Sequence, residues 1–296
     1  MLRVRLLECL AADQARLRQV AATDLAADVP GCPDWTVADL VRHVAVTYLH
    51  KVECMRTGRI PSSWPPDVSA EEPLPLFDRA CRALDAEFDG RDPAALAPTW
   101  YDPDQTVGFW LRRMAQETVI HRVDAELAIG RSVAEIPADL ATDGIDEVLR
   151  LFLGYRSRRW PEDFAEVLPG SAVEILATAG PASWLVRLGP DGATVASDRA
   201  AALAATVPVA SAGNATAGPA SSATAGPASS ATAGPSGNAT AGPSGTATAG
   251  PAATVSASPD RMLLWLWRRH DDDAIAWSGD RAAVDRLRLA LAPATR

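Results

Sequence analysis

Hydrophobic positions in the first half of the chain recur at intervals of three and four residues, the period of a helix with one buried face. Loops rich in proline, glycine and polar residues interrupt the pattern three times. The pattern predicts four long helices, over residues 3–21, 37–56, 73–88 and 107–129. Four amphipathic helices joined by loops are typical of a four-helix bundle, whose sites are built from inward-facing side chains on different helices.

The hydrophobic pattern changes after Gly130, which we expect to end the fourth helix. Beyond it, alternating apolar positions predict short strands mixed with helices. We expect helices over 137–155, 259–269 and 280–291, and strands over 173–178, 184–188, 193–196, 253–257 and 273–278. Ser258, followed by Pro259, is the expected cap of its helix. The chain is therefore predicted to be an α+β protein with two domains, residues 1–136 and 137–296.

A repeat interrupts the second predicted domain at about 211–252. The pentad Ala-Thr-Ala-Gly-Pro recurs there every eight residues, separated by small residues. Because the segment has no large apolar side chain, we expect a disordered or extended insertion in a surface loop. The same lack of large apolar residues argues against a β-solenoid, and a proline-rich binding tract is the functional alternative.

Composition and charge narrow the class of protein. The chain has 296 residues and a net charge of −9, which disfavours a nucleic-acid partner. The N-terminus lacks the apolar stretch of a signal peptide, and no apolar run is long enough to span a bilayer. The cysteines show no CxxC pair, so we expect reduced thiols of a cytoplasmic protein: Cys9, Cys32, Cys54 and Cys81.

Candidate chemistry lies on the fourth predicted helix. Glu117 and His121 are four residues apart, which places both side chains on one helix face. The surrounding residues are mostly apolar, and an unpaired polar group in such surroundings costs a few kcal/mol. A divalent cation would satisfy both side chains. The alternative is an ordinary solvated or hydrogen-bonded pair, because short motifs also match by chance.

A third candidate ligand lies on the second predicted helix. His43 shares a face with the apolar Leu40 and Val44, where a single histidine is more often a hydrogen-bonded core residue. Together with Glu117 and His121 it completes a set of two imidazoles and one carboxylate. Such a set suits zinc, nickel or ferrous iron and leaves coordination positions open. His50 is expected to support this side of the helix or to lie at the surface.

Two segments carry a resemblance to a known family. Residues 31–44, GCPDWTVADLVRHV, resemble the W-T-v-x-d-L-v-x-H signature of the mycothiol-dependent maleylpyruvate isomerase family, within the DinB-like metalloenzymes. Residues 117–126, ETVIHRVDAE, resemble that family's E-x-x-x-H-R-x-D-A-E helix. The resemblance covers most of the chain. It implies a DinB-like metal-binding four-helix bundle followed by a sterol-carrier-like α+β domain.

The resemblance also implies roles for individual residues. The family's metal ligands fall on His43, Glu117 and His121, and its arginine after a Trp-Leu-x-Gly-Arg motif corresponds to Arg269. Here Arg268 replaces the motif's glycine, so a catalytic Arg269 is weighed against a solvated helix end. Asp124 is a candidate partner for a ligand imidazole, with Glu126 or a backbone carbonyl as alternatives.

The function implied is that of a metal-dependent enzyme with mycothiol as co-substrate. Zinc is the favoured metal, and nickel and iron are alternatives. The thiolate would add to an electrophilic small molecule and bring about a cis–trans isomerisation; a mycothiol S-transferase would instead keep the adduct. The other classes are a regulator that senses thiol or metal stress and a non-catalytic module with an apolar pocket lined by Trp110, Trp265 and Trp267. We expect a cytoplasmic monomer or homodimer whose partners are small molecules, with no nucleic acid and no membrane.

Overall fold

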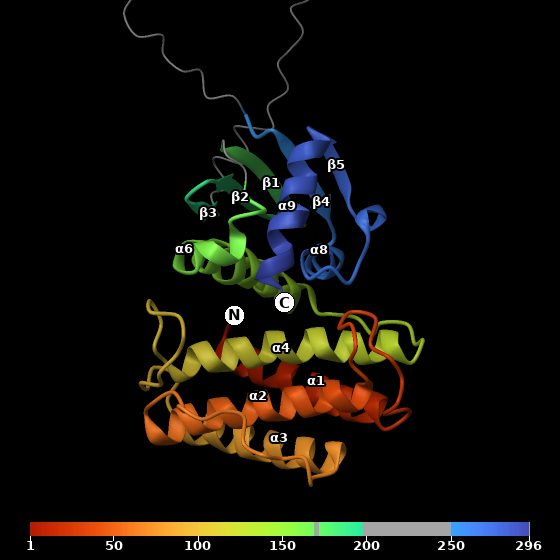
Figure 1. The fold of residues 1–296 in the computed structure, drawn as a ribbon, viewed down its shortest axis with the longest axis vertical. Coiled ribbons are helices and arrows are strands. Elements are labelled where there is room, and N and C mark those ends of the chain that lie inside the picture. The colour runs from red at the N-terminus through yellow and green to blue at the C-terminus, as the bar shows by residue number, and fades with distance from the viewer. Residues whose placement is uncertain (169–171, 198–249, 296) are drawn as a thin grey trace, which may run out of the picture.

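The computed structural model describes residues 1–168, 172–197 and 250–295. The predicted insertion at 211–252 lies outside the described residues up to position 249. Figure 1 shows two parts: a group of long helices, and above it in this view a β-sheet with further helices. The buried apolar side chains of the two parts form one continuous core.

The first part contains the four predicted helices, each within two residues of its expected ends. They are α1 (Arg3–Ala21), α2 (Val37–Thr57), α3 (Pro73–Gly90) and α4 (Val107–Ala128). Helix α4 packs on α1 and α2 and faces the second part of the molecule (Figure 1). Most of its side chains are therefore buried, polar ones included. Buried polar groups need partners, so α4 is where a site is expected.

Local hydrogen bonds fix the starts of the two helices that carry the candidate ligands. Thr36 and Asp39 form a capping box at the start of α2: the Asp39 N–H donates to Thr36 Oγ1 at 3.3 Å, and the Thr36 N–H donates to Asp39 Oδ2 at 2.9 Å. Thr106 caps α4 by accepting from the Phe109 N–H at 3.1 Å. Gly130 follows α4 with a φ of 65°, which glycine adopts without strain.

One long helical stretch leads into the second part. It consists of α5 (Ala138–Glu147), the π-helical η1 (Val148–Tyr155) and the short α6 (Arg156–Arg159), and it is followed by the turn η2 (Pro161–Phe164). The helix predicted over 137–155 is therefore confirmed and continues for one further turn. A π-helical segment is rare and often lies beside a functional site. Here it carries Phe152 to the interface with α4.

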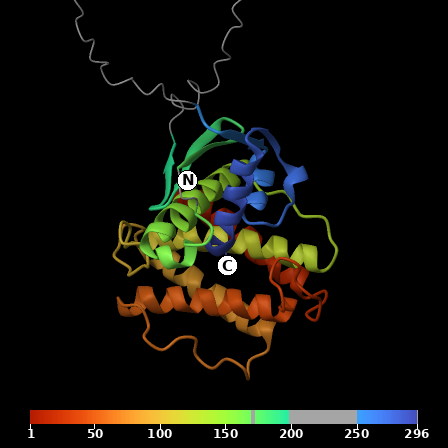
Figure 2. The same cartoon turned by 45° about the horizontal axis from the view of Figure 1, so that its top comes forward.

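The second part is built around a five-stranded sheet in the order β3-β2-β1-β4-β5. Strands β1 and β4 are parallel, and the other neighbouring pairs are antiparallel. The strands are β1 (Val173–Ala179), β2 (Ala182–Gly189), β3 (Gly192–Ala196), β4 (Ala253–Ala257) and β5 (Ala276–Gly279). With α8 (Pro259–Leu266) and α9 (Arg281–Ala294), they confirm the predicted α+β class: a helical bundle followed by a sheet region. Figure 2 shows α9 lying alongside the sheet.

Three local expectations for this part are wrong. Helix α8 ends at Leu266, three residues early, because Arg268 takes a left-handed conformation with a φ of 63°. Ser258 occupies the N-cap position, but its hydroxyl makes no capping hydrogen bond. The strand predicted over 273–278 begins only at Ala276, after the 3₁₀ turn η3 (Asp272–Ala274). Among the described residues, no helix combines the length and apolar character that crossing a membrane requires.

Candidate metal centre

The three predicted ligands meet where α2 faces α4. His43 Nε2 lies 3.2 Å from Glu117 Oε1, and His121 Nε2 lies 3.3 Å from the same oxygen. Candidate ligand atoms of all three residues lie within 4.8 Å of one another. The side chain of His43 is 38% exposed, against 13% for Glu117 and 11% for His121, so the group opens to one side. One carboxylate oxygen and two imidazole nitrogens therefore point at a common place with room beside it.

The charges around this place suit a cation. Burial alone would lower the pKa of His121, but its hydrogen bonds to Asp124 and Glu117 outweigh burial and raise the pKa to about 9. For Glu117 burial acts in the opposite direction and would raise the pKa. His121, His43 and Arg113 nevertheless hold the pKa of Glu117 well below its ordinary range. Glu117 is thus a carboxylate, and the proton on His121 Nε2 takes the position that a metal ion would take.

Asp124 fixes the orientation of the His121 ring. Its Oδ2 lies 3.0 Å from His121 Nδ1, so that nitrogen donates and leaves Nε2 as the metal-facing atom. The pKa of Asp124, which burial would raise, falls to about 2 because of Arg269 and His121. The alternative acceptor Glu126 is bound instead to Arg16 and Arg122. Asp124 is therefore the His121 partner that the sequence left undecided.

Arg269 reaches this group from beyond the end of α8. Its Nε and Nη2 donate to the two oxygens of Asp124, both at 2.8 Å, and its Nη1 donates to the Trp267 carbonyl at 2.8 Å. Only 7% of its side chain is exposed, so it is not a solvated helix end. These bonds make Arg269 a residue that positions His121 through Asp124, and the catalytic role that the resemblance implies stays a prediction.

Two residues of the loop before α2 complete the surroundings. Cys32 Sγ lies 3.8 Å from Asp124 Oδ2 and 3.6 Å from Arg269 Nη2. Burial and the neighbouring Asp124 raise the pKa of this thiol to about 11, so it stays protonated. A Cβ on Gly31 would lie 2.6 Å from Asp124 Oδ1, which only glycine avoids. The sequence indicated their position only by placing both in the family-like stretch 31–44.

Arg113 supports Glu117 from the other side. Its Nη2 donates to Glu117 Oε2 at 2.8 Å and its Nη1 to Glu147 Oε2 at 2.6 Å. Arg113 thereby holds one oxygen of Glu117 and leaves Oε1 for the two imidazoles. The pKa of Glu147 rises to about 7 through burial, although Arg113 and Arg112 oppose the rise. The sequence analysis did not single out this pair, because residue types alone do not show which charges meet.

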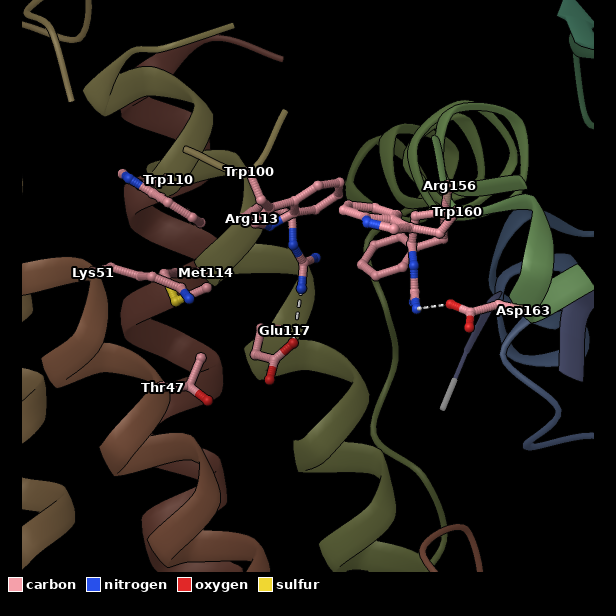
Figure 3. Close-up of a pocket in the computed structure, with 11 residues that line it drawn as sticks. Thr47, Lys51, Trp100, Trp110, Arg113, Met114, Glu117, Arg156, Trp160 and Asp163 are labelled. Atoms are coloured by element: carbon pink, nitrogen blue, oxygen red, sulfur yellow. Dashed lines mark hydrogen bonds and ion pairs between the residues drawn. The ribbon is translucent and has the colours of Figure 1, made fainter. Parts of the chain in front are cut away.

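Two cavities lie on either side of Glu117. The first, which we call the metal-site cavity, has a volume of about 690 Å³ and contains His43, His121, Cys32, Trp267 and Arg269 in its wall. The second, which we call the Lys51 cavity, has a volume of about 440 Å³ and is shown in Figure 3. Glu117 and Phe152 line both. Of the tryptophans expected in a pocket, Trp110 lines the Lys51 cavity and Trp267 the metal-site cavity, whereas Trp265 lines neither.

Two residues near the candidate ligands in the sequence, His50 and Arg122, are not part of the ligand set. His50 contacts Lys51 and Cys54, with its Nδ1 at 3.2 Å from Lys51 Nζ and 3.6 Å from Cys54 Sγ. Arg122 forms ion pairs with Asp13 and Glu126, away from the ligands. Neither residue lines either cavity.

Comparison with known proteins agrees with this picture. Residues 6–126 match the family model described as the mycothiol maleylpyruvate isomerase N-terminal domain, a stretch that contains all three candidate ligands. No curated protein sequence matches the chain.

Two solved structures resemble the whole chain. They are a crystal structure of the mycothiol-dependent maleylpyruvate isomerase, with 14% identity and a TM-score of 0.55, and one of its histidine-to-alanine mutant, with 13% and 0.54. In each case 95% of both chains is covered. At such identities the likeness shows the fold alone. Residues 6–126, the helical part of the chain, are therefore similar to the mycothiol maleylpyruvate isomerase N-terminal domain.

Proposed function

We propose that this protein is a divalent-metal-dependent enzyme of the maleylpyruvate isomerase type that uses a low-molecular-weight thiol, mycothiol, as co-substrate. His43, Glu117 and His121 hold the cation. The observation that carries the proposal is the convergence of two imidazoles on one carboxylate oxygen in the wall of a cavity. Zinc is the favoured ion, because three such ligands and an open position are typical of catalytic zinc; nickel and ferrous iron accept the same set.

A bound divalent cation supplies positive charge that lowers the pKa of a thiol and polarises a carbonyl oxygen. The chain's own residues prepare the place for it. Asp124 keeps the proton of His121 on Nδ1, and Arg269 keeps Asp124 charged and in position. Arg113 holds the second oxygen of Glu117, so that the first faces the two histidines. Ligand geometry is thus fixed before the ion binds, which is how outer partners raise metal affinity.

The reaction conserves every atom of substrate and thiol. The thiolate sulfur adds to one carbon of a double bond conjugated to a carbonyl, and the electron pair moves to the carbonyl oxygen. The former double bond is now single and rotates. The electron pair then returns, expels the thiolate and leaves the trans isomer. The metal-site cavity, lined by Trp35, Ile120 and Trp267, provides a partly apolar place for these steps.

The test is turnover of maleylpyruvate and of other activated alkenes by protein purified without added metal, with mycothiol and a panel of other small thiols. We expect turnover that needs a thiol and does not consume it. Consumption of thiol with formation of an adduct would instead identify an S-transferase. The triple variant His43→Ala, Glu117→Ala, His121→Ala is expected to lose both bound metal and turnover. His270→Ala, at a histidine that lines neither cavity, is the matched control.

Two results would contradict the proposal. One is equal metal content in the triple variant and the wild-type protein. The other is stoichiometric binding of a small apolar molecule without turnover by any thiol in the panel, which would favour the non-catalytic binding module.

A further inference from the structure

Lys51 is the only lysine among the 28 lysine and arginine residues of the chain. It lies on α2, two helical turns beyond His43, and its side chain enters the Lys51 cavity (Figure 3). Everywhere else the chain uses arginine as its basic residue. A compact ammonium group, with three donors and no preferred plane, therefore occurs at one place, beside a candidate metal ligand.

The ammonium of Lys51 has no carboxylate partner among the described residues. Its Nζ lies 3.2 Å from His50 Nδ1 and 4.6 Å from the centre of the Trp110 ring, and no acidic oxygen in the described part of the chain comes within ion-pair distance. The pKa of Lys51 falls to about 8, chiefly through burial; Glu117 opposes the fall and Arg113 adds to it. A cation in partly apolar surroundings without a carboxylate in contact is costly, and an incoming anion would relieve that cost.

The other cations of the cavity are already paired. Arg113 binds two carboxylates, those of Glu117 and Glu147. Arg156 donates to the Ala294 carbonyl at 3.0 Å and lies 4.0 Å from Asp163 (Figure 3). Among the described residues that line this cavity, Lys51 is therefore the cation without an acidic oxygen within ion-pair distance.

Apart from Thr47 and the charged residues, the walls of the Lys51 cavity are aromatic or apolar. Aromatic side chains contributed by the 90–105 loop, α4, η1 and the turn after α6 line it, together with one methionine: Trp100, Trp110, Phe152, Trp160 and Met114. A volume of about 440 Å³ lies within the usual range for small-molecule sites. One ammonium and several ring faces fit a ligand with one carboxylate and a planar apolar body.

We propose that the Lys51 cavity binds a monocarboxylate with a planar, conjugated apolar body, whose carboxylate accepts hydrogen bonds from Lys51 Nζ. The body lies against the aromatic wall and extends toward Glu117. The identification of this ligand as the electrophile rests on the proposed function, and it implies an activated alkene other than maleylpyruvate, which carries two carboxylates. Because Glu117 and Phe152 line both cavities, the electrophile in the Lys51 cavity and the thiol in the metal-site cavity would meet beside the metal.

The single lysine makes a direct experiment available. The full-length, metal-free protein is acylated at pH 8 with a succinimidyl ester, and modification of Lys51 is followed by mass spectrometry. The amino group of Met1, which lies beside Asp143 outside this cavity, serves as the internal reference. The probes are trans-cinnamate, its neutral isostere trans-cinnamamide, and fumarate, a conjugated dicarboxylate without an aromatic body.

Saturating cinnamate is expected to slow acylation of Lys51 at least tenfold without affecting Met1. Binding of an anion favours the unreactive ammonium form and also covers the amine. Cinnamamide and fumarate at the same concentration are expected to slow it less than twofold. Absence of protection by cinnamate, equal protection by the amide, or stronger protection by fumarate would overturn the proposal.

Variants give a second measurement by equilibrium dialysis with cinnamate. Lys51→Met keeps the length of the side chain and removes the charge, and it is expected to weaken cinnamate binding about tenfold or more. Arg131→Gln removes one charge from an exposed position beyond the end of α4 and is expected to leave binding unchanged. Equal affinities in Lys51→Met and wild type would overturn the assignment of the anchor.

The acylation and dialysis assays test the Lys51 site independently of the proposed function. Neither assay needs metal, thiol or turnover. Protection of Lys51 in a protein that shows no thiol-dependent turnover would support the binding site and contradict the enzyme. Turnover in a protein whose Lys51 is not protected would do the reverse.

Discussion

Asp124 is the residue through which the two parts of the molecule act on the candidate metal centre, and its replacement by asparagine tests that link. The carboxylate is fully buried on α4 and joins His121 to Arg269, a residue 145 positions away in the chain. Asparagine keeps the size and shape of the side chain. It removes the charge and one of the two acceptor oxygens that Arg269 uses.

The expected loss follows from the burial of both partners. Asp124 is 0% and Arg269 only 7% exposed, and two bonds of 2.8 Å join them. Removing one member of such a pair leaves a buried charge without compensation and costs about 3–5 kcal/mol. The low pKa of Asp124, about 2 against an ordinary 3.8, corresponds to roughly 2 kcal/mol of preference for the charged form, the same order. Loss of the His121 partner is expected to weaken metal binding about 10- to 100-fold.

Urea denaturation of the metal-free protein at pH 7 measures the first effect, and competition with a zinc chelator measures the second. Asp139→Asn is the control, because its partner Arg5 is 39% exposed and Asp139 itself 49%, and solvent screens such an exposed pair, so the substitution is expected to change the free energy of unfolding little. The folded-state pKa of Asp124 is depressed, so its contribution is present above about pH 4 and is lost as the pH falls toward 2. The difference between wild type and Asp124→Asn should shrink over that interval. Equal unfolding energies at pH 7, or unchanged zinc affinity, would refute the reasoning.

Four further predictions address other parts of the account. Because a metal must displace the proton that His121 binds with a pKa of about 9, zinc affinity measured by chelator competition should rise up to about tenfold per pH unit below pH 9 and level off above it. Gly31→Ala should displace Asp124 or Arg269, because the new Cβ would lie 2.6 Å from Asp124 Oδ1, and should reduce zinc affinity and thiol-dependent turnover together. Thr36→Ala removes the capping box of α2 and should lower the free energy of unfolding by about 1 kcal/mol. Glu147 has a pKa of about 7 in the folded protein, above its unfolded value of 4.5, so the wild-type protein loses stability as the pH rises from about 4.5 to 7. Glu147→Gln has no such loss. The free energy of unfolding of this variant, relative to that of the wild type, should therefore increase by about 1–3 kcal/mol from pH 5 to pH 8.

Each of these predictions has an outcome that contradicts it. A zinc affinity independent of pH between 7 and 9 would mean that His121 carries no competing proton. Wild-type metal affinity in Gly31→Ala would show that the loop yields without cost. An unchanged free energy of unfolding in Thr36→Ala would remove the capping box as a determinant of α2. A Glu147→Gln difference that does not vary with pH would show that Glu147 is already ionised at pH 5.

Much of this fold could be predicted from short-range patterns in the sequence. The helices of the bundle are fixed by periodic apolar residues and by a capping box that stands in four consecutive positions, so their limits follow from short stretches of sequence. The same holds for the short strands before residue 197. Helix α8 ends early because Arg268 adopts a left-handed conformation, which cannot be predicted from an arginine in the sequence. The π-helical turn around Phe152 also lacks a local signal.

The candidate site was predictable where it depends on helical spacing and not where it depends on long-range contact. The four-residue spacing of Glu117 and His121 places them on one helix face, and the family resemblance identifies His43 as the third candidate ligand. The bond from Arg269 to Asp124 joins residues 145 positions apart, and the contact of Cys32 with Asp124 spans 92. Which of several charged residues meet across such separations is decided by the packing of the two parts, so Arg113 and Lys51 did not stand out from sequence alone.

Titration of the metal-free protein with cobalt(II), followed by visible absorption, tests the central claim most directly. The account predicts one tightly bound equivalent per chain, with bands that change when a low-molecular-weight thiol is added, and no binding by the triple variant of His43, Glu117 and His121. An equally saturable cobalt spectrum in the triple variant, or no spectrum in the wild-type protein, would contradict it.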